Sequence, residues 1–388
     1  MRARLCLLLA LLMVLQGCSW IRSWGDDELE PGDPLPLVEF NPTLQTRKMW
    51  STNVGKGIGR HRTQLRPLLA GGTIYVADHE GLLAALDAET GRKRWQVETG
   101  FALSGGPGLS RDTLLMGSQD GEVIAFDAGS GQQRWTATVS SEVLARPVAQ
   151  DGIVVVRCID GRVFGLNLDT GAREWIYDHS VPLLTLRGNS TPLVRAGVVF
   201  LGYDGGEVVA LRLSDGSLIW EQKVVSREGR SELERLADID GQLVFVASDL
   251  LVSSYKNRLA SLAADSGRLL WFKDVSSASG VTIDRTNLAV SDKDDNVWLL
   301  DRRNGSTLWR HDQLQNRQLT RPAFIGRFVV VGDFEGYLHW ISTEDGSVAA
   351  RNRVDDDAII SAPVVSGNRV YVLTRDGELA AFAAGADA

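Results

Sequence analysis

Apolar residues in this chain fall in short runs that are separated by turn residues. Runs of four or five β-prone residues occur, for example, at 73–77, 82–86, 153–156, 198–201 and 328–331. Between them stand pairs of Asp, Glu, Asn, Ser or Thr followed by Gly, and such pairs favour tight hairpin turns that need a positive φ. No helical stretch with proper caps follows about residue 18. The pattern predicts short antiparallel strands joined by tight turns.

The same landmarks recur at a fixed interval. An opening residue precedes a Trp by 28 positions in six units: Pro67 and Trp95, Pro107 and Trp135, Pro147 and Trp175, Pro192 and Trp220, Leu243 and Trp271, Val281 and Trp309. Pro322 opens a seventh unit, in which Ala350 takes the Trp position, and Pro363 opens an eighth that the chain ends before completing. Turn residues, mostly Gly, follow all eight opening residues by 14 positions, and a Gly follows the first seven by 24. Every unit therefore reads as four strands and the turns between them.

Repeated four-stranded units of about 40–45 residues are typical of a β-propeller. We predict an all-β fold, an eight-bladed β-propeller with four antiparallel strands per blade. Segment 47–53, which contains Trp50, is expected to supply the fourth strand of the last blade and so join the two chain ends. The Trp residues are expected to pack between blades. Ala350 then predicts a looser seam after blade seven.

The N-terminus has the layout of a lipoprotein signal. Arg2 and Arg4 precede an apolar run at 5–15, which is too short to span about 30 Å of hydrocarbon, and Gly17 and Cys18 follow it. This end resembles the bacterial lipobox, which implies a signal peptide at 1–17 and a lipid on Cys18. Residues 18–45 are Pro-rich and acidic and predict an extended tether. The propeller is expected to occupy 46–388. Ser19, where Asp would suggest retention in the inner membrane, favours a lipid anchor on the periplasmic face of the outer membrane.

Charge and cysteine content narrow the possible functions. The net charge of −8 and the pI near 5.3 argue against a nucleic-acid binder, which would carry a basic face for phosphates. Three cysteines, Cys6, Cys18 and Cys158, cannot form a disulfide framework. A cofactor-dependent enzyme is not excluded by composition and has to be judged from motifs.

Motifs for catalysis or metal binding are weak. The five histidines show no metal-ligand spacing and are expected on loops or strand surfaces. Asp292, Asp294 and Asn296 begin like a calcium loop, but Val297 and Arg303 stand where that loop needs Gly and Glu. We therefore expect no catalytic residue, no metal and no cofactor apart from the covalent lipid.

One enzyme family has to be weighed against this expectation. The repeat ending Asp-x-x-Thr-Gly-x-x-x-Trp at 87–95 resembles that of the pyrroloquinoline-quinone dehydrogenases, which are also eight-bladed. That family implies adjacent cysteines under the cofactor and ligands for calcium. This chain has no adjacent Cys pair and no insert large enough to cover a quinone. A quinoprotein-like propeller enzyme is therefore kept only as an alternative.

Binding residues are expected where the propeller departs from its own repeat, because loops on a rigid frame carry function. The two longest connectors between blades are adjacent and enter blades four and five. Arg187 and Asp238 each lie five residues before an opening position, which should bring them to the same face. Leu184 and Leu186 have the composition of an exposed anchor pair. Ordinary loop variation, with the two leucines tucked under their loop, explains the spacing equally well.

These residues carry a specific resemblance. A lipidated propeller with Leu184-x-Leu186-Arg187-Gly188, Asp238-Ile239-Asp240 and 336–340 in blade seven resembles the BamB family, the lipoproteins of the outer-membrane β-barrel assembly (BAM) machinery. The resemblance implies a non-catalytic periplasmic scaffold that docks on the POTRA domains of BamA and assists insertion of β-barrel proteins. It assigns the docking positions to Leu184, Leu186, Arg187, Asp238 and Asp240.

The mechanism expected from this resemblance buries the Leu pair on the partner, while the Arg and the two Asp residues pair with opposite charges and set the register. Unfolded outer-membrane proteins are a further candidate ligand, held by strand addition on outer strands. A generic cell-envelope binding propeller is the other alternative.

Overall fold

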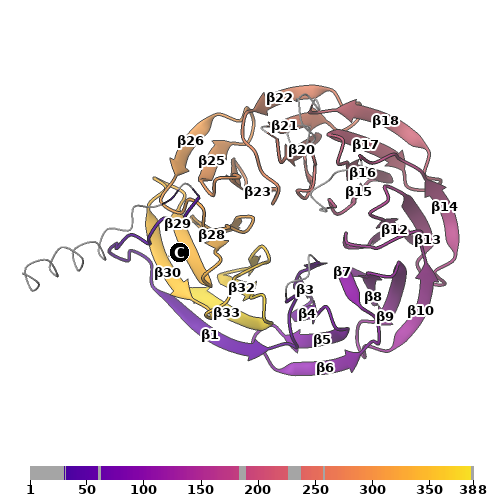
Figure 1. Ribbon diagram of the computed structural model, residues 1–388, viewed down its shortest axis with the longest axis horizontal. Coiled ribbons are helices and arrows are strands. Elements are labelled where there is room, and N and C mark those ends of the chain that lie inside the picture. The colour runs from indigo at the N-terminus through magenta and orange to yellow at the C-terminus, as the bar shows by residue number, and fades with distance from the viewer. Residues whose placement is uncertain are drawn as a thin grey trace, which may run out of the picture.

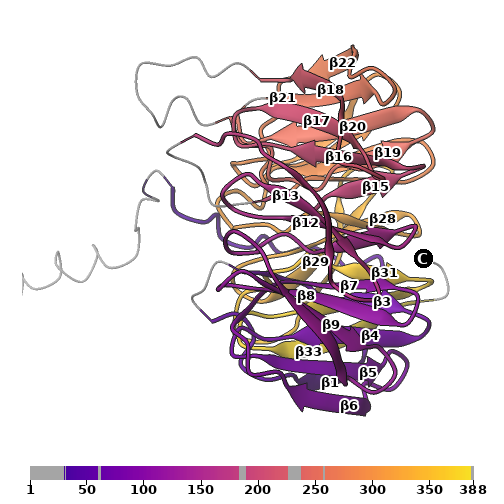
Figure 2. The ribbon, with the colours of Figure 1, turned by 90° about the vertical axis from the view of Figure 1, so that its right-hand side faces the viewer.

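A computed structural model of the chain describes residues 30, 32–59, 63–182, 189–225, 237–256 and 258–385. Every regular element in these ranges is a β-strand, and the strands form eight antiparallel sheets arranged in a ring (Figure 1). Figure 2 shows the same ring from the side. The predicted eight-bladed propeller is confirmed. Within the described residues, we find no helix whose length and hydropathy would let it cross a bilayer.

The blades follow the repeat units, and their strands run from the axis to the rim in chain order. Blade 1 contains β3 (Leu68–Ala70), β4 (Thr73–Ala77), β5 (Leu82–Asp87) and β6 (Lys93–Glu98). Blade 2 contains β7 (Leu103–Ser110), β8 (Thr113–Ser118), β9 (Glu122–Asp127) and β10 (Gln133–Thr138), with β2 (Gln64–Leu65) added in parallel to β7. Blade 3 contains β11 (Val148–Gln150), β12 (Ile153–Arg157), β13 (Val163–Asn167) and β14 (Arg173–Tyr177). Blade 4 contains β15 (Leu193–Arg195), β16 (Val198–Gly202), β17 (Glu207–Arg212) and β18 (Leu218–Lys223).

The second half of the ring repeats this order. Blade 5 contains β19 (Val244–Val246), β20 (Asp249–Ser254), β21 (Arg258–Ala263) and β22 (Leu269–Lys273). Blade 6 contains β23 (Val281–Ile283), β24 (Asn287–Ser291), β25 (Val297–Asp301) and β26 (Thr307–His311). Blade 7 contains β27 (Ala323–Ile325), β28 (Phe328–Gly332), β29 (Tyr337–Ser342) and β30 (Val348–Arg353). Blade 8 contains β31 (Val364–Ser366), β32 (Arg369–Leu373), β33 (Glu378–Ala384) and β1 (Thr46–Asn53).

The last blade is built from both ends of the chain. β1 pairs with β33 in antiparallel register from Thr46 opposite Ala384 to Asn53 opposite Glu378. The ring therefore closes by hydrogen bonds between segments more than 300 positions apart in sequence, as the Trp50 segment predicted. This pairing ties the two ends of the chain into one sheet and so closes the ring.

Tryptophan and glycine hold the blades together. Trp135 on β10 donates a hydrogen bond from Nε1 to the Leu168 carbonyl of blade 3 at 2.9 Å. Gly171, with φ of +72°, lies flat against its ring, and a Cβ there would come within 2.6 Å of the ring. A small residue, Ala125, stands opposite Trp135 on β9. Equivalent Nε1 bonds to the next blade are made by Trp50, Trp95, Trp175, Trp220 and Trp309. The predicted packing role of the Trp residues is confirmed.

The seam after blade seven is filled in another way, so the expectation of a looser seam was wrong. Ala350 lies opposite Trp340 of β29, and Trp340 is fully buried in a core that spans blades 7 and 8. In this blade the large residue, Trp340, is on the third strand and the small residue is on the fourth. In blade 2, by contrast, the Trp is on the fourth strand and the small residue faces it from the third. Trp340 donates its Nε1 hydrogen bond to Asn352 within its own blade at 2.9 Å. Leu44, which precedes β1, contributes to the same core.

The described part of the predicted tether is attached to the propeller. Leu35 accepts a hydrogen bond from Arg317 at 3.1 Å and donates its backbone N–H to the Gln315 carbonyl at 3.1 Å. Leu37 packs on the core between blades 6 and 7. The backbone N–H of Leu44 bonds to the Ala349 carbonyl at 3.1 Å. The described part of this stretch forms no strand before Thr46 and is bonded along the side of blades 6 and 7. The remainder of the tether, together with Cys18, lies outside the described residues.

Candidate partner-binding site

The two long connectors fall partly outside the described residues. Leu184, Leu186 and Arg187 belong to 183–188, which the structure does not describe, and the second connector is not described at 226–236. Asp238 and Asp240 are described, as are the residues that follow the first connector. The site is therefore defined here by the ends of the two connectors and by the side chains beneath them.

A capping position in the turn after the second strand shows where the repeat changes. In most blades this position holds Asp, Ser or Thr, whose side-chain oxygen accepts a backbone N–H four residues later; the residues are Asp78, Ser118, Asp292, Asp333 and Thr374. Blades 3 and 4 instead carry Cys158 and Tyr203, which offer no such cap. Blades 3 and 4, which adjoin the long connectors, therefore lack the side-chain cap that most other blades use in this turn.

Arg157 lies at the centre of this region. Its side chain is 1% exposed. Nη1 donates to Ser190 Oγ at 3.0 Å and to the Gly202 carbonyl, and Nη2 lies 3.3 Å from Asp204 Oδ1. The guanidinium also sits over the Tyr203 ring, 4.6 Å from its centroid. Because Ser190 directly follows the first connector, Arg157 joins that connector to blade 4.

The end of the second connector reaches the same place. The N–H of Ile239 donates to the Tyr203 carbonyl at 3.2 Å, and Ile239 is fully buried. Gly202 allows this approach, because a Cβ there would lie 2.4 Å from the Ile239 side chain. The flanks of both connectors therefore converge on one face of the ring, around Arg157. The two connectors themselves were expected on one face, and their described ends meet there.

Three carboxylates gather around this point. One oxygen from each of Asp204, Asp238 and Asp240 lies within 4.8 Å of the others. Asp204 is 3% exposed and Asp238 is completely buried, while Asp240 is partly buried. Asp240 Oδ1 has no hydrogen-bond partner among the described residues. Such close carboxylates repel one another in a medium of low dielectric constant.

The electrostatic result is a cluster that resists full ionisation. Burial, with added repulsion from Asp204 and Asp238, raises the pKa of Asp240 to about 8. Burial also raises the pKa of Asp204, against the opposing charge of Arg157. Among the described side chains, Arg157 is the one cation in contact with the cluster. The arrangement favours a further positive charge at this place, as a neighbouring guanidinium or ammonium group would supply.

A second buried charge network lies in blade 7. Arg317 donates from Nε to Asp333 Oδ2 at 2.8 Å and also pairs with Glu335. His339 Nε2 lies 2.9 Å from the same Asp333 oxygen, while its Nδ1 accepts from Arg351 at 3.2 Å. Burial opposes ionisation of Asp333, but the bond from His339 and the charge of Arg317 bring its pKa below the usual value. This carboxylate is fully compensated within the blade.

Two of the histidines lie in the interior of the propeller, although the sequence predicted surface positions for them. His339 and His311 are buried, at 0% and 6% exposure, and not on the surface as expected. His339 completes the Asp333 network, and His311 Nδ1 lies 3.0 Å from the Gly346 carbonyl of the next blade. Buried imidazoles were missed because their hydrogen-bond partners come from other strands and blades.

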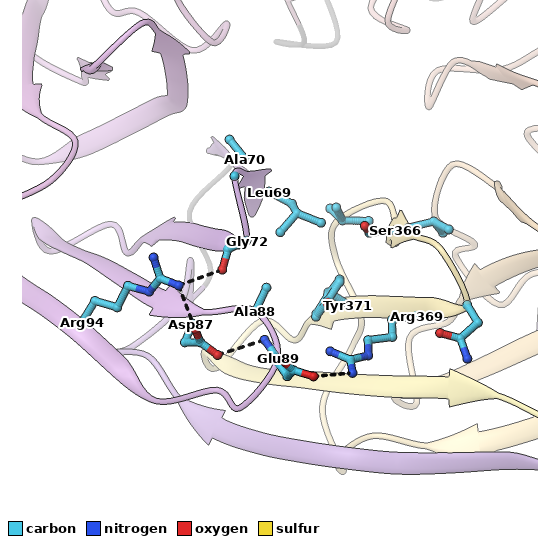
Figure 3. A pocket seen from close by; sticks show the side chains of 14 residues that line it. Leu69, Ala70, Gly72, Asp87, Ala88, Glu89, Arg94, Ser366, Arg369 and Tyr371 are labelled. Atoms are coloured by element: carbon cyan, nitrogen blue, oxygen red, sulfur yellow. Dashed lines mark hydrogen bonds and ion pairs between the residues drawn. The ribbon is translucent and has the colours of Figure 1, made fainter.

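A polar cavity of about 800 Å³ lies at the seam between blades 8 and 1 (Figure 3). Its charged side chains already have partners: Arg94 pairs with Asp87 at 2.7 Å, and Arg369 pairs with Glu89 at 3.2 Å. The cavity is formed by turns between first and second strands and between third and fourth strands. The acidic cluster is formed by the other set of connections and lies on the opposite face. Among the described residues that line this cavity, we find no unpaired charge that points to a ligand.

The sequence reasoning missed Arg157 and Tyr203, although a signal was present. At the position of Arg157 the other blades carry small or apolar residues: Ala77, Gly117, Gly202, Ser253, Ser291, Gly332 and Leu373. At the position of Tyr203 they mostly carry a turn cap. Comparison of each unit with its own repeat would have marked both residues.

Known proteins match this chain along almost its whole length. A family model described as outer membrane protein assembly factor BamB matches residues 38–102, 79–311 and 299–387. The chain is 49% identical over 375 residues to outer membrane protein assembly factor BamB of Pseudomonas aeruginosa, with 97% of each chain covered. It is 36% identical over 391 residues to the protein of that name from Escherichia coli K12, with 97% of this chain and 98% of the relative covered.

Solved structures show the same architecture. BamB from Moraxella catarrhalis superposes with a TM-score of 0.80 at 27% identity and covers 87% of this chain and 100% of its own. A quinohemoprotein alcohol dehydrogenase from Comamonas testosteroni gives a TM-score of 0.67 at 13% identity, with 87% of this chain and 76% of that chain covered, and shares the fold alone.

Fold and repeat place the protein among the eight-bladed propellers with repeats like those of quinoproteins. Within that class, the chain belongs to the BamB family of outer membrane protein assembly factors. The resemblance drawn from the sequence is confirmed. Membership supports a role in outer membrane protein assembly and an association with the outer membrane.

Proposed function

We propose that this protein is a non-catalytic scaffold of the BAM machinery that docks on the POTRA domains of BamA and assists insertion of β-barrel proteins. The observation that carries the proposal is the convergence of the described ends of both long connectors on Arg157. A rigid ring holds the ends of two adjacent loops at one place, and such loops are suited to partner binding. Leu184, Leu186 and Arg187 are the contact residues in this proposal.

The two aspartates take different roles in this proposal. Because Asp238 is completely buried, its carboxylate is not available to pair directly with a partner in this conformation. We assign it, with Asp204 and Arg157, to shaping and anchoring the connectors. Asp240 is partly exposed and remains suited to direct pairing with a cation of the partner. Truncating a buried charge of this kind costs affinity through loss of loop geometry.

Docking is tested by capture of purified BamA POTRA domains on immobilised protein. We expect Leu184→Ala/Arg187→Ala to weaken binding at least tenfold, with the fold and melting temperature unchanged. Leu308→Ala/Arg285→Ala is the matched control, because both residues are exposed on blade 6, away from the connectors. Equal binding by the connector variant and the control would refute the proposal and favour a generic envelope-binding propeller.

Membrane attachment through Cys18 is part of the same proposal. A lipidated N-terminal Cys would hold the propeller on the periplasmic face of the outer membrane, since acyl chains contribute about 0.8 kcal/mol per buried methylene. We expect Cys18→Ser to abolish labelling with radioactive palmitate and to release the protein from outer-membrane fractions. Unchanged labelling and fractionation would argue against the anchor.

Capture of unfolded outer-membrane proteins is a second candidate function. The fourth strands of blades 3 to 6 are sheet edges, and each carries exposed apolar side chains. The residues at 39–54% exposure are Ile176, Leu218, Ile219, Leu269, Leu270, Phe272 and Leu308. An edge strand with exposed apolar residues can accept another strand.

This second function is tested with an unfolded β-barrel segment bearing a photo-crosslinker. We expect crosslinks on β18, β22 and β26, and fewer of them after Leu218→Ser/Phe272→Ser. Crosslinks spread evenly over all eight rims would show that the apolar residues do not select the ligand.

A further inference from the structure

The innermost part of each blade begins at the same position of the repeat. The residue just before each opening position borders the axis, and in blades 1 to 8 these residues are Arg66, Gly106, Arg146, Thr191, Gln242, Gly280, Arg321 and Ala362. Seven of the eight line a single axial cavity of about 250 Å³, with Gly280 next to it through a bridge to Gln242. Figure 1 shows the inner strands β3, β7, β15 and β23 around this axis. The repeat therefore builds one ring of side chains in the centre of the propeller.

This ring is positively charged in a protein of net charge −8. Three of its eight positions are arginine, none is acidic, and Thr191 and Gln242 add a hydroxyl and an amide. In the described part of the chain, Arg66, Arg146 and Arg321 have no ion-pair partner. Elsewhere in the described residues, arginines such as Arg94, Arg134, Arg317 and Arg369 are paired. The acids that offset charge on the outside of the ring are missing at its centre.

The side chains reach across the axis. Arg321 of blade 7 donates from Nη1 to Gln242 Oε1 of blade 5, passing Gly280 of blade 6. Its Nε is buried and has no hydrogen-bond partner in the described residues. Arg66 and Arg321 also line a second cavity of about 240 Å³, together with Arg375 and residues of the connectors. The ring thus opens toward the face that carries the connectors.

Burial and like charge both act against the charged form of the three arginines. Burial and the positive charges of Arg66 and Arg146 lower the pKa of Arg321 to about 9. Burial likewise lowers the pKa of Arg66, with a contribution from Arg146, and of Arg146 itself. Partly buried like charges are costly unless an opposite charge joins them.

We propose that the axial ring of Arg66, Arg146 and Arg321 is a binding site for a small multivalent oxyanion of the phosphate or polycarboxylate class. Guanidinium groups bind such oxygens through paired, charge-assisted hydrogen bonds. Thr191 and Gln242 supply further polar contacts. The limited volume restricts the ligand to a small molecule or a single anionic group.

The site is tested by calorimetry and thermal unfolding with inorganic phosphate, pyrophosphate and citrate, each compared with sodium chloride of equal ionic strength. We expect at least one of these anions to bind and to raise the melting temperature above the chloride value. Arg146→Gln/Arg321→Gln should weaken that binding at least tenfold, while the exposed control Arg285→Gln should leave it unchanged. Preference for pyrophosphate or for citrate then identifies the ligand class.

A second measurement separates an anion site from a structural role. Removing uncompensated like charges should leave the melting temperature of Arg146→Gln/Arg321→Gln in chloride equal to or above that of the wild type. A lower melting temperature in chloride would mean that these arginines stabilise the empty ring, and it would overturn the proposal. Anion effects no larger than those of chloride, or effects that persist in the variant, would overturn it as well.

Discussion

This propeller contains two buried charge networks built from Asp and Arg side chains. The pKa of an aspartate is lowered in one network and raised in the other. In blade 7, Asp333 is surrounded by Arg317 and His339 and keeps a pKa below its usual range. Between blades 3 and 5, three aspartates share the described cation Arg157, and the pKa of Asp240 rises to about 8. One network is complete within its blade. The other joins three carboxylates and Arg157 at the described ends of two long connectors.

The two networks can be compared directly, because each contains a residue at the same position of the repeat. Arg317 and Asp238 both lie five residues before an opening position, as does Arg187. In blade 7 an Arg at this offset is 2% exposed and serves the fold. At the entrance to blade 5 the same offset carries a buried acid next to two others. The same position of the repeat can therefore hold the cation of a compensated ion pair or a member of an acidic cluster, depending on the charges that neighbouring blades bring to it.

The largest effect is expected when the complete network is broken. Arg317→Ala removes both pairs and leaves Asp333 buried without its main cation, which typically costs 3–5 kcal/mol. We expect a loss of this order in the free energy of unfolding, measured by denaturant titration. Binding of POTRA domains by the folded fraction should not change. A strong loss of docking at full stability would contradict the division between the two networks.

A smaller loss of stability and a larger loss of docking are expected for Arg157→Met. The thioether fills part of the volume, but Asp204 loses its cation and Ser190 its link to blade 3. We expect roughly 2–3 kcal/mol of destabilisation and at least a tenfold loss of POTRA binding. Docking is measured by surface plasmon resonance at a temperature where the variant is folded. Wild-type affinity in the folded variant would show that Arg157 does not position the connectors.

Asp240→Asn should increase stability in a pH-dependent manner. Because the folded state raises the pKa of Asp240 from 3.8 to about 8, its ionisation disfavours folding, and this cost grows as pH rises from about 4 to about 8. The variant should match the wild type near pH 4 and exceed it by about 1–2 kcal/mol at pH 8. If Asp240 also pairs with a cation of the partner, the variant binds POTRA domains more weakly above pH 8. Parallel pH–stability curves for the two proteins would contradict the raised pKa.

The smallest effect is expected for Cys158→Ser, which restores the cap used in blade 2. The thiol is buried and its pKa is raised to about 11, mainly by burial, so it is an inert packing group. A hydroxyl would compete with Asp160 Oδ1, 3.1 Å away, for the backbone N–H of Arg162, whereas Ser118 accepts that of Glu122 at 2.9 Å. We expect the unfolding free energy to change by less than about 1 kcal/mol, with docking unaffected. A large loss of docking would place Cys158 within the partner site.

Much of the fold could be predicted because the repeat is local and periodic. Spacing between Pro, Gly and Trp set the blade number, and Trp50 revealed how the ring closes. The prediction of a loose seam at Ala350 was wrong because packing at a seam depends on the combined volume of the two facing side chains. Trp340 on the opposite strand supplies the missing volume. The buried state of His339 was missed for a related reason, since its partners lie on other segments.

For the site, the sequence by itself determined which connectors depart from the repeat and which residue types they carry. It also contained the ring of arginines, one position before each opening residue. Only the tertiary structure decided that Asp238 is buried, that Arg157 lies next to the described ends of both connectors, and that three arginines from blades 1, 3 and 7 share one cavity. The physical reason is that periodicity specifies where a residue sits in its own blade. Burial and electrostatic compensation depend on which side chains the closed ring brings to the same point.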